Sequence, residues 1–292
     1  MIVDFRVRPP FKAFLENSLF FPRNPAPDPV TMSGLHLGIE PYESFSRKSM
    51  SAFMDEMDEA GVDLGVVMGR QAPPSIGSVP NEDVAEMVAA YPGRFLGFGS
   101  VCPQDINAAI AEVDRIVGLG LRGVAMDNGY WDLYDDDESL FPLYEKIQSA
   151  GLILSLTSSI YIGKDMTYCM PVHIQRVAKR FPGLKITVPH GGWPWTTEMC
   201  AVAFQNSNIY LVPDFYMHLP DMPGAEQYLR SANSFLSHRL LYASSYPIRP
   251  LGQSIRQFRE LDFASEEIRR RCLGENAARL LGLATPASST AA

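Results

Sequence analysis

The sequence predicts one α/β domain, an eight-stranded (β/α)8 TIM barrel, and three observations favour this fold class. Short, nearly continuous apolar segments alternate with helical patterns along the chain, as expected for parallel strands that are covered on both faces. Eight such strands fit within 292 residues. A glycine-rich phosphate turn, the usual sign of an open doubly wound sheet, is missing after the first strand, which runs into Pro9 and Pro10.

The elements follow from hydrophobic periodicity. Met50, Phe53 and Met57 recur at helical spacing, Gly61 ends that pattern, and a β-rich segment follows directly. The same step recurs, so the expected strands span residues 2–8, 62–68, 95–101, 121–127, 152–158, 184–190, 208–215 and 239–247. The expected helices lie within residues 47–62, 81–94, 106–120, 139–151, 172–183, 195–207 and 224–238.

The domain assignment is simple. We expect the barrel to span residues 1–283, with residues 265–283 as a C-terminal helical cap and residues 284–292 as a flexible tail. Residues 9–47 interrupt the repeat with many prolines and phenylalanines where a barrel needs only a short connection. This segment is either a lid over the barrel mouth or a dimer contact.

Composition and charge limit the classes of partner that the protein can bind. A formal net charge of −8 argues against nucleic acid, because binding a phosphate backbone requires a surplus of Lys and Arg. No apolar run approaches the ~20 residues that span a bilayer, and the four widely spaced cysteines suit reduced thiols. We therefore expect a cytoplasmic protein without membrane spans or disulfides that binds a small molecule.

Barrel enzymes carry their chemistry at the C-terminal ends of the strands, so the strand ends supply the candidate site. Arg6 and Arg8 lie two residues apart and are expected to share a face, with Phe5 and Val7 on the other face. The other candidates, in chain order, are Arg70, Asp127, Thr157, His190, Trp193, Asp214, Tyr216, Ser245 and Tyr246.

Several motifs in order give a resemblance. The segment "PGLKITVPHGGWPW", then "RLLYASSYP", then "LGENAARLLGL" resemble the amidohydrolase-related family of the amidohydrolase superfamily, the group with aminocarboxymuconate-semialdehyde decarboxylase, resorcylate decarboxylases and pyrone-dicarboxylate lactonase. The resemblance covers essentially the whole chain. It implies a TIM barrel with its site at the strand ends.

The chain departs from the family's metal-binding pattern. "RVR" stands where the resemblance implies a His-x-His pair, Thr157 stands for a histidine, and Ser245 stands for an aspartate. Of the usual set only His190 remains. Guanidinium is not a metal ligand and fixed positive charges repel a dication, so we expect no metal and no cofactor.

The remaining chemistry suggests roles for the candidates. Arg6 and Arg8 suit a clamp for a carboxylate or oxyanion; the alternative is a structural role, paired with Asp4, Asp127 or Asp214. His190 is the candidate general acid or base, with Asp214 as its orienting acid. Arg70, Asp127, Thr157 and Ser245 are expected to contact substrate, and Trp193, Tyr216 and Tyr246 to line a pocket for a flat ring.

Three functions remain open on this evidence. The main hypothesis is a metal-independent hydrolase that acts on a lactone, ester or amide of a small carboxylate-bearing compound, aromatic or unsaturated. The first alternative is a decarboxylase of an aromatic or unsaturated acid. The second is a degenerate barrel that binds a ligand or serves as the inactive partner of an active paralogue. A homodimer is the expected assembly.

Overall fold

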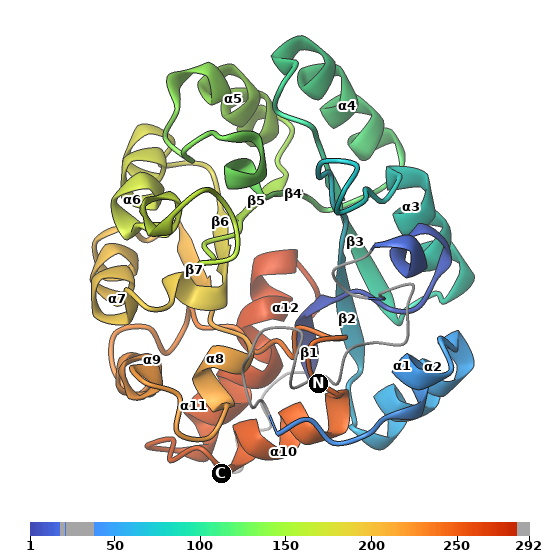
Figure 1. The fold of residues 1–292 in the computed structure, drawn as a ribbon. Helices are drawn as coiled ribbons and strands as arrows, with labels where there is room; N and C mark the ends of the chain where they lie inside the picture. The colour runs from blue at the N-terminus through green and yellow to red at the C-terminus, as the bar shows by residue number, and fades with distance from the viewer. Residues whose placement is uncertain (18–20, 22–37, 285–292) are drawn as a thin grey trace.

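The computed structural model describes residues 1–17, 21 and 38–284. Within these residues seven parallel strands form one sheet in sequence order, and helices surround it (Figure 1). The strands are β1 (Val3–Val7), β2 (Leu64–Met68), β3 (Phe95–Ser100), β4 (Gly123–Met126), β5 (Ile153–Leu156), β6 (Ile186–Pro189) and β7 (Ile209–Val212). The TIM-barrel prediction is confirmed.

The helices cover the outside of the sheet, and each segment expected to be helical contains one. They are α1 (Glu43–Ser46), α2 (Met50–Glu59), α3 (Asn81–Ala90), α4 (Ile106–Gly118), α5 (Phe141–Ser149), α6 (Pro171–Arg180), α7 (Thr196–Gln205), α8 (Phe215–His218), α9 (Ala225–Ala232), α10 (Leu251–Glu260), α11 (Glu266–Arg270) and α12 (Asn276–Leu281). The sequence did not predict the short helices α1 and α8 or the longer helix α10 (Leu251–Glu260). Its apolar face is carried by Leu251, Ile255 and Phe258, a pattern that periodicity could have detected.

The prediction of an eighth regular strand at residues 239–247 is wrong. The segment after Arg239 instead makes isolated parallel bridges, from Leu240 to Leu211 of β7 and from Tyr246 to Val7 of β1. Between these bridges, Phe5 donates its backbone N–H to the Tyr242 carbonyl at 3.0 Å. The segment therefore joins β7 to β1 and closes the barrel without a continuous ladder.

Asp4 completes this closure with a side chain. Its Oδ1 accepts the backbone N–H of Ser244 at 3.0 Å and that of Arg6 at 3.2 Å. The carboxyl thus takes the place of a carbonyl acceptor where the backbone ladder is interrupted. Burial raises the pKa of Asp4 to about 7, although its hydrogen bonds to Ser244 and Arg6 act in the opposite direction.

Strand β1 changes register within its five residues. Its pairing with β2 shifts between Asp4 and Val7, so two residues of β1, Phe5 and Arg6, face the single residue Val66 of β2. As a result Phe5 packs with the inner cluster of the barrel, whereas Val7 packs with the outer layer under the helices. The expectation that Phe5 and Val7 share a face is therefore wrong, because simple alternation does not anticipate a bulge.

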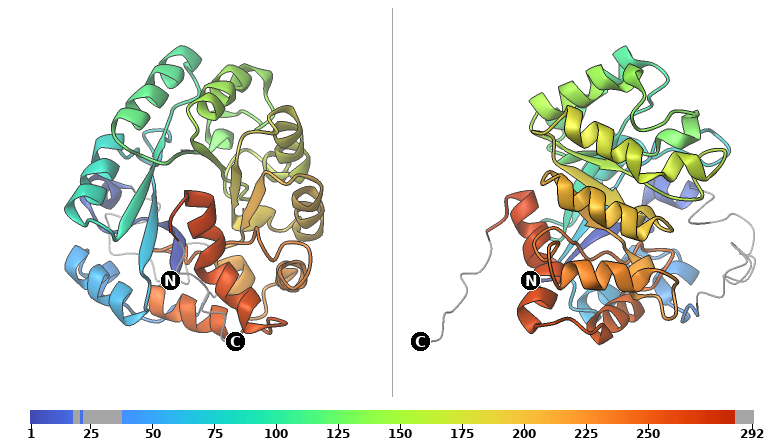
Figure 2. Two further views of the ribbon diagram at one scale, coloured as in Figure 1. Left: turned by 180° about the vertical axis from the view of Figure 1, so that it is seen from behind. Right: turned by 90° about the vertical axis from the view of Figure 1, so that its left-hand side faces the viewer.

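The inner cluster fills the lower barrel. Side chains from the strands meet the last helix, α12, which crosses the end of the barrel (Figure 2). This cluster includes Val3, Phe5, Leu64, Val66, Met68, Phe98, Ala125, Ile153, Val212, Leu241, Ala243, Ala277, Leu280 and Leu281. Gly274 lets this cap approach β1, because a Cβ there would lie 2.2 Å from the Met1 carbonyl oxygen. The apolar cap leaves the opposite end of the barrel for polar groups.

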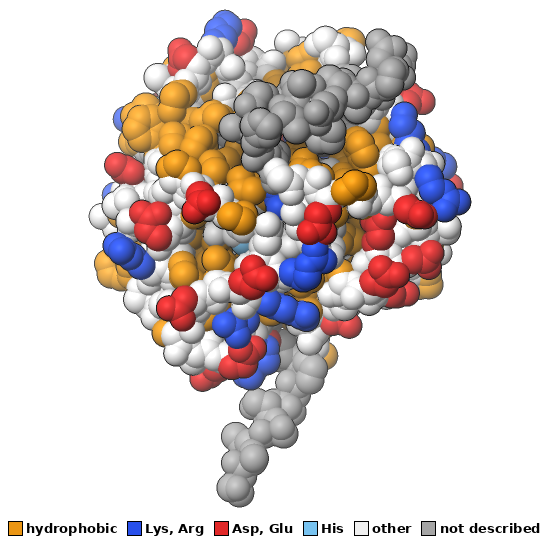
Figure 3. All heavy atoms as spheres, turned by 60° about the horizontal axis from the view of Figure 1, so that its bottom comes forward, with side chains coloured by type: hydrophobic (Ala, Val, Ile, Leu, Met, Phe, Trp, Pro, Cys, Tyr) orange, Lys and Arg blue, Asp and Glu red, His pale blue; other side chains and the backbone are white. Residues whose placement is uncertain are grey.

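Two further expectations meet the limits of the described chain. Residues 18–20 and 22–37, the greater part of the expected lid or dimer segment, lie outside the described residues, as do residues 285–292 of the expected tail. In the part that is described, no helix has the length and apolar character to cross a bilayer. Figure 3 shows acidic and basic side chains intermixed on one face of the molecule.

The burial of Asp4 predicts that the stability of the folded protein depends on pH. Because the pKa of Asp4 rises from 3.8 to about 7 on folding, the stabilisation from its protonated form is complete at low pH and is lost as pH rises through about 7. Asp4→Asn cannot ionise, so its melting temperature relative to the wild type should increase between about pH 5 and about pH 8. Each kcal/mol corresponds to roughly 2–4 °C in a chain of this size.

The control is Asp63→Asn, an exposed aspartate that precedes β2. Thermal melts of the wild type and both variants at the two pH values provide the measurement. A constant difference between Asp4→Asn and the wild type across this range would contradict the assignment.

Candidate active site

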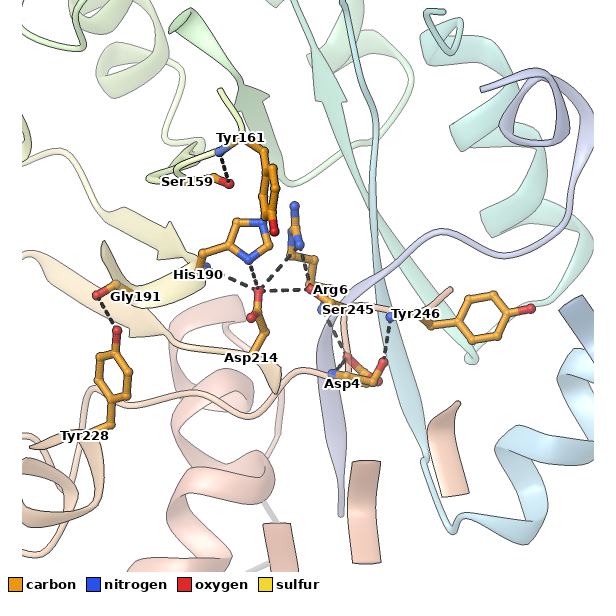
Figure 4. Close-up of polar contacts among 11 residues, drawn as sticks. Asp4, Arg6, Ser159, Tyr161, His190, Gly191, Asp214, Tyr228, Ser245 and Tyr246 are labelled. Carbon is orange, nitrogen blue, oxygen red and sulfur yellow. Dashed lines mark hydrogen bonds and ion pairs between the residues drawn. The ribbon is translucent and has the colours of Figure 1, made fainter. Parts of the chain in front are cut away.

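One carboxylate oxygen stands at the centre of the polar end of the barrel. Asp214 Oδ2 accepts a hydrogen bond from Ser245 Oγ at 2.9 Å and lies 3.4 Å from Arg6 Nη1 (Figure 4). His190 approaches the same oxygen twice, with its backbone N–H at 3.2 Å and with Nδ1 at 2.9 Å. Groups separated by as many as 239 residues therefore meet at one atom.

Three of these residues have left-handed or otherwise unusual backbone conformations. The φ angles are 64° at His190, directly after β6, 48° at Asp214, two residues after β7, and 62° at Ser245, within the closing segment. Such conformations cost of the order of 1–3 kcal/mol for residues other than glycine and persist only where surrounding contacts hold them. The turns aim the three side chains at one another, and the shared hydrogen bonds hold the turns.

Ser245 links Arg6 to the carboxylate. Arg6 Nη1 donates to Ser245 Oγ at 2.6 Å, and Ser245 in turn donates its own proton to Asp214. The hydroxyl proton is therefore directed to the carboxylate and not to the His190 imidazole. This arrangement differs from a nucleophilic serine, whose proton must be taken by a neighbouring base.

A second ion pair lies on the neighbouring strands. Arg70, just after β2, places Nε 2.8 Å from Asp127 Oδ2 at the end of β4, and both side chains are buried. Burial opposes the ionisation of Asp127, but Arg70, Arg8, a hydrogen bond from Thr157 and Arg6 together lower its pKa. Asp127 is therefore charged at neutral pH.

The guanidinium groups influence one another. Burial lowers the pKa of Arg8 well below its ordinary value, and the positive charges of Arg6 and Arg70 lower it further. The Arg70 guanidinium also lies 5.6 Å from the centre of the Tyr130 ring. Three buried arginines at one end of a barrel produce a positive field that favours an anion.

His190 is neutral in this environment. Burial lowers its pKa, and the charges of Arg6 and Arg8 act in the same direction, against the effect of Asp214. The carboxylate beside Nδ1 favours the tautomer with its proton on that nitrogen. Nε2 then carries a lone pair and can accept a proton from a bound molecule.

Aromatic rings flank the imidazole. Tyr216 contacts His190 edge to face, with 5.5 Å between ring centres, and Trp193 stacks on Tyr216 at 5.0 Å. Tyr161 points toward His190 and Arg6 from the connection after β5 (Figure 4), and half of its surface is exposed. The sequence analysis missed Tyr161, because it lies several residues beyond the strand end.

Tyr246 lies apart from the other candidates. Its hydroxyl donates to Ser44 Oγ at 2.9 Å, and its ring packs edge to face on Phe53 at 4.6 Å. In Figure 4 its side chain points away from Asp214. The structure thus brings together Arg6, Arg8, Arg70, Asp127, Thr157, His190, Trp193, Asp214, Tyr216 and Ser245, and places Tyr246 against α2.

The donor set does not fit a divalent metal. In the described part of the chain, no three His, Cys, Asp or Glu side chains are grouped so that they could hold a metal ion. The guanidinium of Arg6 already contacts both Asp214 and Ser245, so a fixed positive charge occupies the side of the carboxylate that a metal would use. A second cation there would be repelled, so no chemistry through a metal is derived for this site.

This donor set predicts a metal-free protein. Elemental analysis should find no stoichiometric zinc, manganese or iron, and a chelator should leave the melting temperature unchanged, because no bound ion contributes to the folded state. Native mass spectrometry measures the same property independently. One equivalent of metal retained through purification would overturn the prediction.

The network around Asp214 predicts strong coupling with Arg6. Asp214→Asn removes the charge that balances a buried arginine, so it should lower the free energy of unfolding by about 3–5 kcal/mol. Arg6→Met alone should also destabilise, and the double variant Asp214→Asn/Arg6→Met should recover part of the loss. Denaturant unfolding of the four proteins measures the coupling energy, and strictly additive losses would argue against it.

Comparisons with known proteins agree with this architecture. Residues 38–283 match the amidohydrolase family. The chain is 28% identical over 243 residues to the 2-amino-3-carboxymuconate-6-semialdehyde decarboxylase of Dictyostelium discoideum; the match covers 70% of this chain and 65% of that protein, less than two thirds of its length.

Two solved structures are also similar. A TIM-barrel protein from Bordetella bronchiseptica, described as uncharacterized, has a TM-score of 0.89 and 36% identity, covering 96% of this chain and 98% of its own. A 5-carboxyvanillate decarboxylase from Novosphingobium aromaticivorans, solved with manganese and 4-hydroxy-3-methoxy-5-nitrobenzoic acid, has a TM-score of 0.65 and 18% identity, covering 94% and 88%. At that identity the likeness shows the fold alone. The family match spans most of the chain, which therefore belongs to the amidohydrolase family.

Proposed function

We propose that this protein is a decarboxylase of a small aromatic or unsaturated carboxylic acid, and that its arginines perform the charge-stabilising role that a metal performs elsewhere. The observation that carries the proposal is the Asp214 network, in which a neutral His190 and a cationic Arg6 share one buried carboxylate oxygen. That network presents a proton acceptor beside a fixed positive charge. Both are needed to hold an acidic hydroxyl as an oxyanion.

The proposed reaction follows from these groups. His190 Nε2 takes the proton of a hydroxyl group on the substrate, and Arg6 and Arg8 stabilise the resulting oxyanion. The imidazolium then returns its proton to the carbon that bears the carboxylate. The bond between that carbon and the carboxylate breaks, CO2 leaves, and the electron pair of the broken bond restores the conjugated system.

The placement of the arginines suits decarboxylation for a physical reason. Loss of CO2 removes negative charge from the carboxylate, so a cation bound only to that group would stabilise the starting state. A cation beside the ring oxygen instead stabilises the part of the molecule that keeps its charge. The flat surfaces of Tyr216 and Trp193 supply a wall for the conjugated part of the substrate.

The hydrolase hypothesis is the second candidate. The His190–Asp214 pair can equally take a proton from water, which is the step that ester or lactone hydrolysis requires. Two of the similar proteins reported above are described as decarboxylases, which supports the first candidate. A binding protein without catalysis is the third possibility, and the assay below separates all three.

The test is a direct assay of CO2 release. Purified protein is incubated in a chelator with hydroxylated benzoic acids and unsaturated carboxylic acids, and with lactones and esters of the same acids. Time-dependent CO2 formation from an acid supports the decarboxylase, and acid formation from a lactone or ester supports the hydrolase. Binding without turnover across the panel would indicate a degenerate barrel.

Arg8 variants test the charge role. Arg8→Met should reduce turnover on the order of 100-fold or more, because it removes one of the groups proposed to stabilise the oxyanion. Arg8→Lys keeps the charge but loses the planar fork, so it should retain an intermediate rate. Arg122→Met, an exposed arginine before β4 at the opposite end of the barrel, is the control. Equal rates in Arg8→Met and the control would exclude this role.

A further inference from the structure

A layer of hydroxyl groups crosses the barrel interior below the arginines. Ser100 of β3 pairs with Ala125 of β4, Ala125 pairs with Ser155 of β5, and Ser155 pairs with Thr187 of β6. Four neighbouring strands therefore present three hydroxyls and one methyl group at the same level. None of these hydroxyls has a part in the network around Asp214.

The hydroxyls of Ser155 and Thr187 face the inside of the barrel. Leu154 and Leu156, on either side of Ser155, belong to the outer core layer beneath the helices. Ile186 and Val188, on either side of Thr187, belong to the same outer layer. Because side chains alternate along a strand, the side chains between them point inward.

These hydroxyls are buried and have no hydrogen-bond partner in the described chain. The exposed fractions are 1% for Ser100, 1% for Ser155 and 0% for Thr187, and each hydroxyl oxygen lacks a donor or acceptor among the described residues. A buried hydroxyl without a partner is costly, and native proteins contain few of them. Three such hydroxyls in one layer indicate a shared hydrogen-bond partner that is not part of the described chain.

The layer lies within reach of the charged site. Asp127 and Thr157 follow Ala125 and Ser155 by two residues on the same strands, which corresponds to about 7 Å along a strand. That separation is comparable to the length of a six-membered ring with a substituent at each end. Ala125 retains 8% of its surface, the largest exposed fraction in this layer.

We propose that Ser100, Ser155 and Thr187 form a buried subsite for an uncharged oxygen substituent on the far side of the substrate ring. This proposal rests on the proposed function for the position of the anionic end, which lies among the arginines. A serine or threonine hydroxyl can donate to and accept from a hydroxyl, methoxy or carbonyl oxygen. None of the three brings the positive charge that a second buried carboxylate would require.

The subsite therefore narrows the substrate class. It selects a monocarboxylic acid with a neutral oxygen group distal to its anionic end, in preference to a dicarboxylic acid or an unsubstituted ring. A site that hydrogen-bonds a substituent rejects the analogue without it, because the buried polar groups are then left without partners. The specificity would thus come from residues that take no part in the chemistry.

The test compares the binding of two acids to the wild type and two variants. Isothermal titration calorimetry measures the Kd of 4-hydroxybenzoate and of benzoate for the wild type, Ser155→Ala and Thr187→Val, and thermal melts measure stability without ligand. The wild type should bind 4-hydroxybenzoate at least about 10-fold more tightly than benzoate, and each variant should lose most of that difference. The melting temperature should stay the same or rise, because a hydroxyl without a partner has been removed.

The matched control is Ser158→Ala. Ser158 is equally buried, but its hydroxyl donates to the Cys169 carbonyl at 3.0 Å, so its removal should lower the melting temperature and leave the preference between the acids unchanged. Two results would overturn the subsite: a wild type without preference for the hydroxylated acid, or variants that weaken both acids equally. The first result is also expected if the layer holds only water.

The two proposals fail separately. Absence of CO2 release with the binding preference intact would refute the proposed reaction and leave the subsite standing. CO2 release at equal efficiency from 2-hydroxybenzoate and 2,4-dihydroxybenzoate, which differ only in the distal oxygen, with no change in Ser155→Ala, would support the reaction and refute the subsite.

Discussion

The buried carboxylate of Asp214 is the interaction on which the arrangement of the site depends. It binds Arg6 from the first strand, His190 from the turn after β6 and Ser245 from the segment that closes the barrel. Each of these groups would be costly to bury alone: a guanidinium without a counter-charge, an imidazole without an oriented proton and a hydroxyl in an unusual turn. One oxygen atom satisfies all three, and the strained turns at the strand ends are maintained by the same contacts.

The sequence was sufficient for the fold class and for the composition of this network. Apolar segments of strand length between helical patterns specify the barrel, because both properties are local. Arg6, His190, Asp214 and Ser245 could be found because a barrel brings the ends of its strands to one rim. The pairing of particular partners was not available from the sequence, since Arg6 was expected beside any of three acids and the structure selects one.

The remaining differences have physical causes that are not local. The register shift in β1 depends on how β1 meets β2, so alternation alone placed Phe5 and Val7 on the same face. Tyr246 follows Ser245 directly, yet the turn at Ser245 directs it outward to Ser44. The hydroxyl layer could not be predicted, because Ser100, Ser155 and Thr187 come from separate strands and only the register between the strands shows that they share a level.

The contact between Asp4 and Ser244, which helps to close the barrel, has a consequence for biosynthesis. Asp4 and the Ser244 amide that it accepts are separated by 240 residues, so a ribosome makes the acceptor long before the donor. Asp214, the partner of Arg6, and Ser244, the partner of Asp4, both emerge late, so until then the two side chains lack these contacts and remain exposed to water. These charges protect an early, unpaired strand edge from association with other chains. Asp4 and Arg6 thus have two consequences: they oppose association of the nascent strand with other chains, and they later form the contacts that close the barrel.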